Sequence, residues 1–170
     1  MDDAAPIPQV RAVPLPPAGH EAIHRSLDEV PFVQLGEGNA LQLLQVDLAQ
    51  GLWIVRTRFA PGHQVQTHYH TGVVFAVTEQ GRWFYSEYPD VVNSPGSYLY
   101  EPAGSLHTLT IPKDQDGPTQ VWFAIYGANV NVDPAGQVLS ITDAHTILPA
   151  YRALCKAQGL SSERVIVSGG

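Results

Sequence analysis

Two histidines separated by a single residue, His68 and His70, lie in the stretch "PGHQVQTHYHTGVVFAV". Alternate residues of a strand share a face and stand about 7 Å apart along it, so two imidazoles at this spacing can bind one ion. The same pattern also fits two polar side chains on the solvent-facing side of a sheet. Taken alone, the pair leaves a metal site and a solvated strand face as open alternatives.

A second segment, "GSYLYEPAGSLH", ends in a third histidine, His107. The first segment has a glycine, five residues and then HxH. The second has a glycine, five residues, Pro-x-Gly, two residues and a histidine. These spacings resemble the two sequence motifs of the cupin superfamily, although Ile111 stands where the second motif usually ends in asparagine. The resemblance implies an all-β, double-stranded β-helix (jelly-roll) barrel with a metal ion bound by His68, His70 and His107.

The acidic ligand of most cupins is missing from its usual place. Most cupins have a glutamate four or five residues after the second histidine, where this chain has Val74 and Phe75. Because His68 and His70 are expected to point inward, residues of the same parity, including Val74, should also point inward. An apolar side chain cannot bind a metal, so the expected ligand set is reduced to three neutral imidazoles.

A glutamate on the next strand is a candidate replacement. If Gln80-Gly81 formed a two-residue hairpin loop, Val74 would lie opposite Glu87, and opposed residues share a face. Glu87 would then be a fourth ligand or a base beside the metal. A register slip of one residue would place it outside the barrel, as an ordinary surface glutamate.

Three imidazoles suit Fe, Zn, Ni or Cu, so the ligands alone do not fix the metal. Such a site leaves open positions on a doubly charged ion, and it favours a bidentate ligand that arrives as an anion, such as a hydroxyketone or a diketone. Aromatic residues Trp83, Tyr85 and Trp122 are candidates for the wall that binds an aryl substrate. They fit equally well as plain core.

A longer resemblance narrows the expected reaction. The stretches "LLQVDLAQGLWIVRTRFAPG", "HTGVVFAVT", "SYLYEPAGSLHTL" and "VWFAIYGANVNVD" resemble the family of 2,4'-dihydroxyacetophenone dioxygenases. This resemblance covers about residues 30 to 160. It implies Fe(II) at the three histidines and O₂-dependent cleavage of the hydroxyketone to 4-hydroxybenzoate and formate, a step of aromatic catabolism. Other metal-cupin enzymes, such as an isomerase or a diketone dioxygenase, and a non-enzymatic metal-binding sensor remain alternatives.

The composition fits this class of protein. A chain of 170 residues allows one domain with a sizeable core. The net charge of −7 disfavours nucleic acid and anionic membranes as partners. The N-terminus is acidic and proline-rich, unlike a signal peptide, and Cys155 is the only cysteine, so we expect a cytoplasmic protein.

Turn residues divide the middle of the chain into many short strand-like runs. We expect an N-terminal arm over 1–30, with one short helix in "HEAIHRSLDEV", a barrel over 31–142, and a C-terminal region over 143–170. Apolar residues at helical spacing predict a helix at about 146–158, with Pro149 in its first turn and Cys155 on its buried face. By analogy with other cupins, we expect a homodimer or homotetramer.

Overall fold

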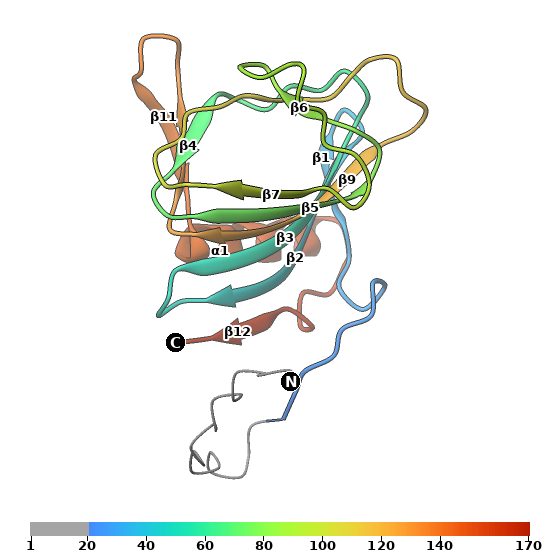
Figure 1. The fold of residues 1–170 in the computed structure, drawn as a ribbon. Helices are drawn as coiled ribbons and strands as arrows, with labels where there is room; N and C mark the ends of the chain where they lie inside the picture. Colours follow the sequence, from blue (N-terminus) through green and yellow to red (C-terminus); the bar gives the residue numbers. More distant parts are fainter. Residues whose placement is uncertain (1–20) are drawn as a thin grey trace, which may run out of the picture.

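Short runs of β-branched and aromatic residues become strands along most of the chain, in a computed structural model that describes residues 21–170 (Figure 1). The twelve strands are β1 (Val33–Gly36), β2 (Asn39–Asp47), β3 (Leu52–Phe59), β4 (His68–His70), β5 (Val74–Gln80), β6 (Phe84–Tyr85), β7 (Tyr98–Glu101), β8 (Leu109–Thr110), β9 (Thr119–Tyr126), β10 (Asn129–Val132), β11 (Val138–Thr142) and β12 (Ile166–Ser168). The single helix of this region is α1 (Ala144–Ala157). The predicted all-β class is confirmed.

The strands form three sheets that enclose a common interior. The largest has the order β1-β2-β3-β9-β5-β7, with β12 added in parallel to β2. A second sheet has the order β11-β10-β4, and β6 pairs with β8 in a third. In Figure 1, the large sheet forms one wall of the barrel, and β4, β6 and β11 lie across from it. This is the jelly-roll arrangement, in which two walls bury one core between them.

Strand alternation fills that interior. On β9, Val121, Phe123 and Ile125 are buried in the core, and on the neighbouring β3 the core residues are Trp53, Val55 and Phe59. Successive residues of a strand point to opposite faces, so the two strands present an apolar surface to the barrel. The wall opposite this surface carries the histidines.

The C-terminal helix begins and ends close to the predicted bounds. Asp143 caps it by accepting hydrogen bonds from the backbone N–H groups of His145 and Thr146. Its buried face packs on β1 and β2, and Cys155 is buried there as predicted. Pro149 lies in the second turn and not in the first. Pro149 is exposed.

The predicted N-terminal arm is described only in part, because residues 1–20 lie outside the described region. Residues 21–30 form turns and irregular backbone, so the short helix predicted there is wrong for the part that is described. The buried amide of Gln42 donates hydrogen bonds to the carbonyls of Leu27 and Val30. Gln42 of β2 thus binds these two carbonyls. Ile23 and Leu27 are exposed, so a helix here would have no apolar face to bury.

Within residues 21–170, no helix is both long enough and apolar enough to cross a membrane.

Candidate metal centre

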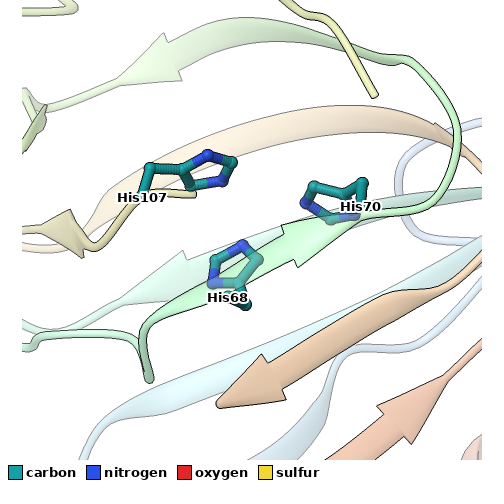
Figure 2. A group of neighbouring side chains, drawn as sticks. All are labelled: His68, His70 and His107. Atoms are coloured by element: carbon teal, nitrogen blue, oxygen red, sulfur yellow. The ribbon is translucent and has the colours of Figure 1, made fainter. Parts of the chain in front are cut away.

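The three histidines of the two sequence motifs converge at one place in the barrel. His68 and His70 lie at the ends of β4, where alternate side chains point to the same side. His107 is joined to them by a backbone bridge, in which the N–H of each of His68 and His107 donates to the carbonyl of the other at 3.0 Å. Figure 2 shows the three rings turned toward a common space.

Their geometry fits one small ion. The three ligand atoms, one from each imidazole, all lie within 4.8 Å of one another. The ring of His68 lies 5.0 Å from that of His70 and 4.6 Å from that of His107, measured between centroids. All three side chains are buried. A set of nitrogen atoms this close and this dry is typical of a metal site.

Burial keeps the three imidazoles neutral. Loss of solvent, together with the neighbouring His68 and His107, lowers the pKa of His70 to about 3. Loss of solvent and the neighbouring His68 lower the pKa of His107 to about 4. The pKa of His68 is also lowered by burial, although the carbonyl of Gln66 opposes the shift. This carbonyl lies 2.7 Å from Nδ1 of His68, which leaves Nε2 free to bind a metal.

A carboxylate that the sequence analysis missed lies beside the histidines. Glu101, the last residue of β7, is buried, and its Oε2 lies 3.3 Å from Nε2 of His107 and 3.5 Å from Nε2 of His70. The hydroxyl of Tyr85 donates a hydrogen bond to the other oxygen, Oε1. Burial raises the pKa of Glu101 to about 7, although the Tyr85 hydrogen bond opposes this rise.

The unpaired atoms at this place favour a bound cation. Oε2 of Glu101 and Nδ1 of His70 are both buried and have no hydrogen-bond partner. Buried polar atoms without partners are rare in folded proteins. A divalent cation beside the histidines would be a partner for Oε2 of Glu101, so the residues present fit a metal ion.

The strand pairing that suggested Glu87 for this place is wrong. Strand β5 is flanked by β7 on one side and β9 on the other, so no edge is left for a hairpin partner after Gly81. Val74 is paired with Glu101 instead. Glu87 is exposed, and its carboxylate accepts hydrogen bonds from the backbone N–H and the hydroxyl of Thr108.

The three predicted wall aromatics have different positions. Tyr85 lines the cavity at the histidines. Trp83 is fully buried in the core, where its indole N–H donates to the hydroxyl of Thr78. Trp122 alternates with the inward-facing residues of β9 and lies outside the buried cluster, so it faces away from the barrel interior. Of the three, Tyr85 alone is placed to contact a ligand.

The cavity inside the barrel has a volume of about 300 Å³. We call it the barrel cavity. The polar residues that line it are the three histidines, Glu101, Tyr85, Thr57, Asn129 and Thr142. The remaining lining is apolar: Leu35, Leu41, Trp53, Val55, Phe59, Val65, Leu109, Phe123, Ile125 and Ile147. A concave, largely apolar site with a few convergent polar groups is typical of small-molecule binding.

The other histidines of the described region lie apart from this centre. His63 lies before β4, where one of its ring nitrogens is 3.2 Å from the amide nitrogen of Asn39. His24 and His145 are exposed. His20 lies outside the described residues.

Fold and site together define the class of this protein as a cupin with a three-histidine centre. The chain belongs to the family described as the ChrR Cupin-like domain, whose model matches residues 20–124. No curated protein is significantly similar to it.

Solved structures support the same fold. A protein of unknown function with a cupin-like fold from Ralstonia eutropha JMP134 is 34% identical, with a TM-score of 0.74, and the match covers 87% of this chain and 96% of that one. An RmlC-like cupin from the same organism is 23% identical, with a TM-score of 0.75 over 81% and 89% of the two chains. An acetylacetone dioxygenase from Acinetobacter johnsonii is 19% identical, with a TM-score of 0.68 over 85% and 99%. At 23% and 19% identity, the similarity to the last two structures shows a shared fold alone.

Proposed function

We propose that this protein is a non-haem Fe(II) dioxygenase that cleaves the C–C bond of an aryl α-hydroxyketone, with 2,4'-dihydroxyacetophenone as the expected substrate. The products would be 4-hydroxybenzoate and formate, and the atoms of the ketone and one O₂ balance those of the two acids. The observation that carries the proposal is the buried carboxylate of Glu101 beside three neutral histidines, at the wall of a largely apolar cavity.

His68, His70 and His107 would hold the iron. When bound, Fe(II) would polarise the two oxygens of a chelating hydroxyketone and supply the electrons needed to activate O₂. Because the three imidazoles are neutral, they would leave the charge of a bound divalent ion uncompensated. A substrate that binds as an anion would therefore be favoured electrostatically, once Glu101 has taken up its proton.

Glu101 would accept the proton that the hydroxyketone loses on binding. A general base works best when its pKa lies near the working pH, and burial brings this carboxyl to about 7. The hydrogen bond from Tyr85 to Oε1 orients the carboxylate, so that Oε2 faces the histidines. Tyr85 itself stays protonated, because burial and the nearby Glu101 raise its pKa well above the usual range.

The apolar residues of the barrel cavity would bind the aryl ring and exclude water. Phe123, Ile125, Leu109 and Val55 lie on the walls around the histidines. Excluding water strengthens every charge interaction inside the site. A dioxygenase with this fold is named for acetylacetone. Acetylacetone is also a small ketone with two oxygens that can bind one metal, and this supports a ketone substrate on chemical grounds.

A non-enzymatic metal-binding cupin is the second candidate function. It is favoured by the family match, which carries the name of ChrR and not of an enzyme. Other metal-cupin reactions, such as an isomerase or a diketone dioxygenase, would use the same three histidines.

The deciding experiment combines metal analysis of anaerobically purified protein with an oxygen electrode. We expect one iron per chain and O₂ consumption that depends on 2,4'-dihydroxyacetophenone. With ¹⁸O₂, one labelled oxygen should appear in each acid product, and label in only one product would refute this route. Metal binding without O₂ consumption on any hydroxyketone or diketone would favour the non-enzymatic candidate.

A further inference from the structure

A second cavity lies on the other side of the residues that flank the metal centre. We call it the outer cavity, with a volume of about 360 Å³. It is formed by the end of β7, the loop after β6 and the loop that leads to His107. Tyr85, Glu101 and His107 line both this cavity and the barrel cavity, so the two share one wall.

This shared wall is a single layer of three side chains in mutual contact. Tyr85 donates a hydrogen bond to Glu101, and Oε2 of Glu101 lies 3.3 Å from Nε2 of His107. The rings of Tyr85 and His107 are 4.3 Å apart between centroids. A ligand in the outer cavity is therefore one side chain away from the barrel cavity.

The rim of the outer cavity is apolar and open to solvent. Tyr88, Val91 and Leu106 line it and are 61%, 64% and 54% exposed. Apolar side chains exposed around a concavity are typical of a functional surface. Apolar cavities also take up small uncharged gases such as xenon, which has no polar groups to be satisfied.

We propose that the outer cavity is a second approach to the metal centre and takes dioxygen, while the ketone occupies the barrel cavity. This inference rests on the proposed function. The barrel cavity is near the lower end of the range of roughly 300–1,000 Å³ found for ligand sites, so a bound aryl ketone fills it. A second substrate then needs another route. The contacts between Tyr85, Glu101 and His107 exclude a ring, but small side-chain movements suffice to pass a diatomic gas.

The test uses the full chain loaded anaerobically with Fe(II), with nitric oxide as the probe for dioxygen. Val91→Trp fills the rim of the outer cavity, and Leu106→Ala widens it. Val138→Trp is the matched control, because Val138 is also exposed but lies on β11 and lines neither cavity. Equal metal content and equal thermal midpoints establish that the variants are folded.

Stopped-flow mixing measures the association of nitric oxide in the presence of saturating ketone. We expect Val91→Trp to slow association several-fold, Leu106→Ala to leave it equal or faster, and Val138→Trp to match the wild type. The KM for O₂ should rise in Val91→Trp while the KM for the ketone stays the same. Wild-type association in Val91→Trp, or a higher KM for the ketone alone, would overturn the second approach.

Crystals of the metal-free protein under xenon give a readout that does not depend on activity. Xenon should occupy the outer cavity in the wild type and be displaced in Val91→Trp, and its absence from the wild-type cavity counts against the proposal. If no ketone is oxidised but Val91→Trp still slows nitric oxide, the proposed function fails and the second approach stands. If ketone is oxidised and Val91→Trp behaves as the wild type, the second approach alone fails.

Discussion

Val74 and Glu101 are paired directly across β5 and β7, and both side chains are buried inside the barrel. Val74 occupies the position from which most cupins are expected to supply an acidic ligand, and the acid here comes from the neighbouring strand at the same level. Paired residues of adjacent strands share a face and have Cβ atoms about 5 Å apart. An acid on β7 instead of β5 therefore still lies beside the histidines. Tyr85 donates a hydrogen bond to it.

Replacement of Glu101 tests the role of this carboxylate. In Glu101→Gln the side chain keeps its shape and still accepts a hydrogen bond from Tyr85, but it no longer takes a proton. We expect kcat on the hydroxyketone to fall by roughly 100-fold or more, the range typical of a lost general base. Steady-state oxygen consumption, together with iron content, provides the measurement.

The matched control is Glu87→Gln, on the exposed side of Thr108. This variant should keep nearly full turnover, because an amide oxygen still accepts from Thr108. A loss at Glu87 equal to that at Glu101 would restore Glu87 as the functional acid, contrary to the position that we assign to it.

The sequence was sufficient to predict the histidines but not the acid that completes their surroundings. His68, His70 and His107 follow from local spacing, and α1 follows from its apolar periodicity. The position of Glu101 depends on which strand pairs with β5. That pairing joins segments that are far apart in the sequence, so a local pattern does not predict it. The Gln80-Gly81 turn signal is local and favoured a hairpin, but Trp83 pairs with Asn93 instead. The exposed–inward alternation of "YLYE" is the signal that could have indicated Glu101.

Loss of one histidine should weaken metal binding. For His107→Ala we expect the affinity for Fe(II) to fall by more than the roughly 10- to 100-fold seen for outer-shell partners, because a direct ligand is removed. Titration of the metal-free protein with a competing chelator measures this loss. His63→Ala is the control, since His63 lies outside the group of three, and its affinity should match the wild type.

The metal-free protein should lose stability as the pH falls. The pKa of His70 is about 3 and that of His107 about 4 when folded, against 6.5 as the ordinary value, so between these limits the unfolded chain binds more protons. Unfolding then becomes more favourable at lower pH. Glu101 acts in the opposite direction between pH 4.5 and about pH 7, because its carboxyl binds the proton more tightly in the folded state. The effect of this one group is smaller than the combined effect of the three histidines.

Urea unfolding from about pH 7.5 down to about pH 5 measures this dependence, with an expected loss on the order of a few kcal/mol. A variant with all three histidines changed to glutamine keeps Glu101 but has none of these imidazoles, so its stability should no longer fall as the pH falls. An equally steep dependence in that variant would show that other groups cause the acid sensitivity.

Removal of the Tyr85 hydroxyl should move the acid limb of the pH–rate profile. Its hydrogen bond lowers the pKa of Glu101, so in Tyr85→Phe this pKa should rise above its folded value of about 7. If Glu101 works as a base in its ionised form, activity is lost below its pKa, and the half-maximal point of the acid limb moves to higher pH. Tyr100→Phe is the matched control on the same strand, because Tyr100 is exposed and alternates with Glu101. An unshifted acid limb in Tyr85→Phe, with reduced turnover at every pH, would mean that Tyr85 only packs against His107 and does not tune the carboxylate.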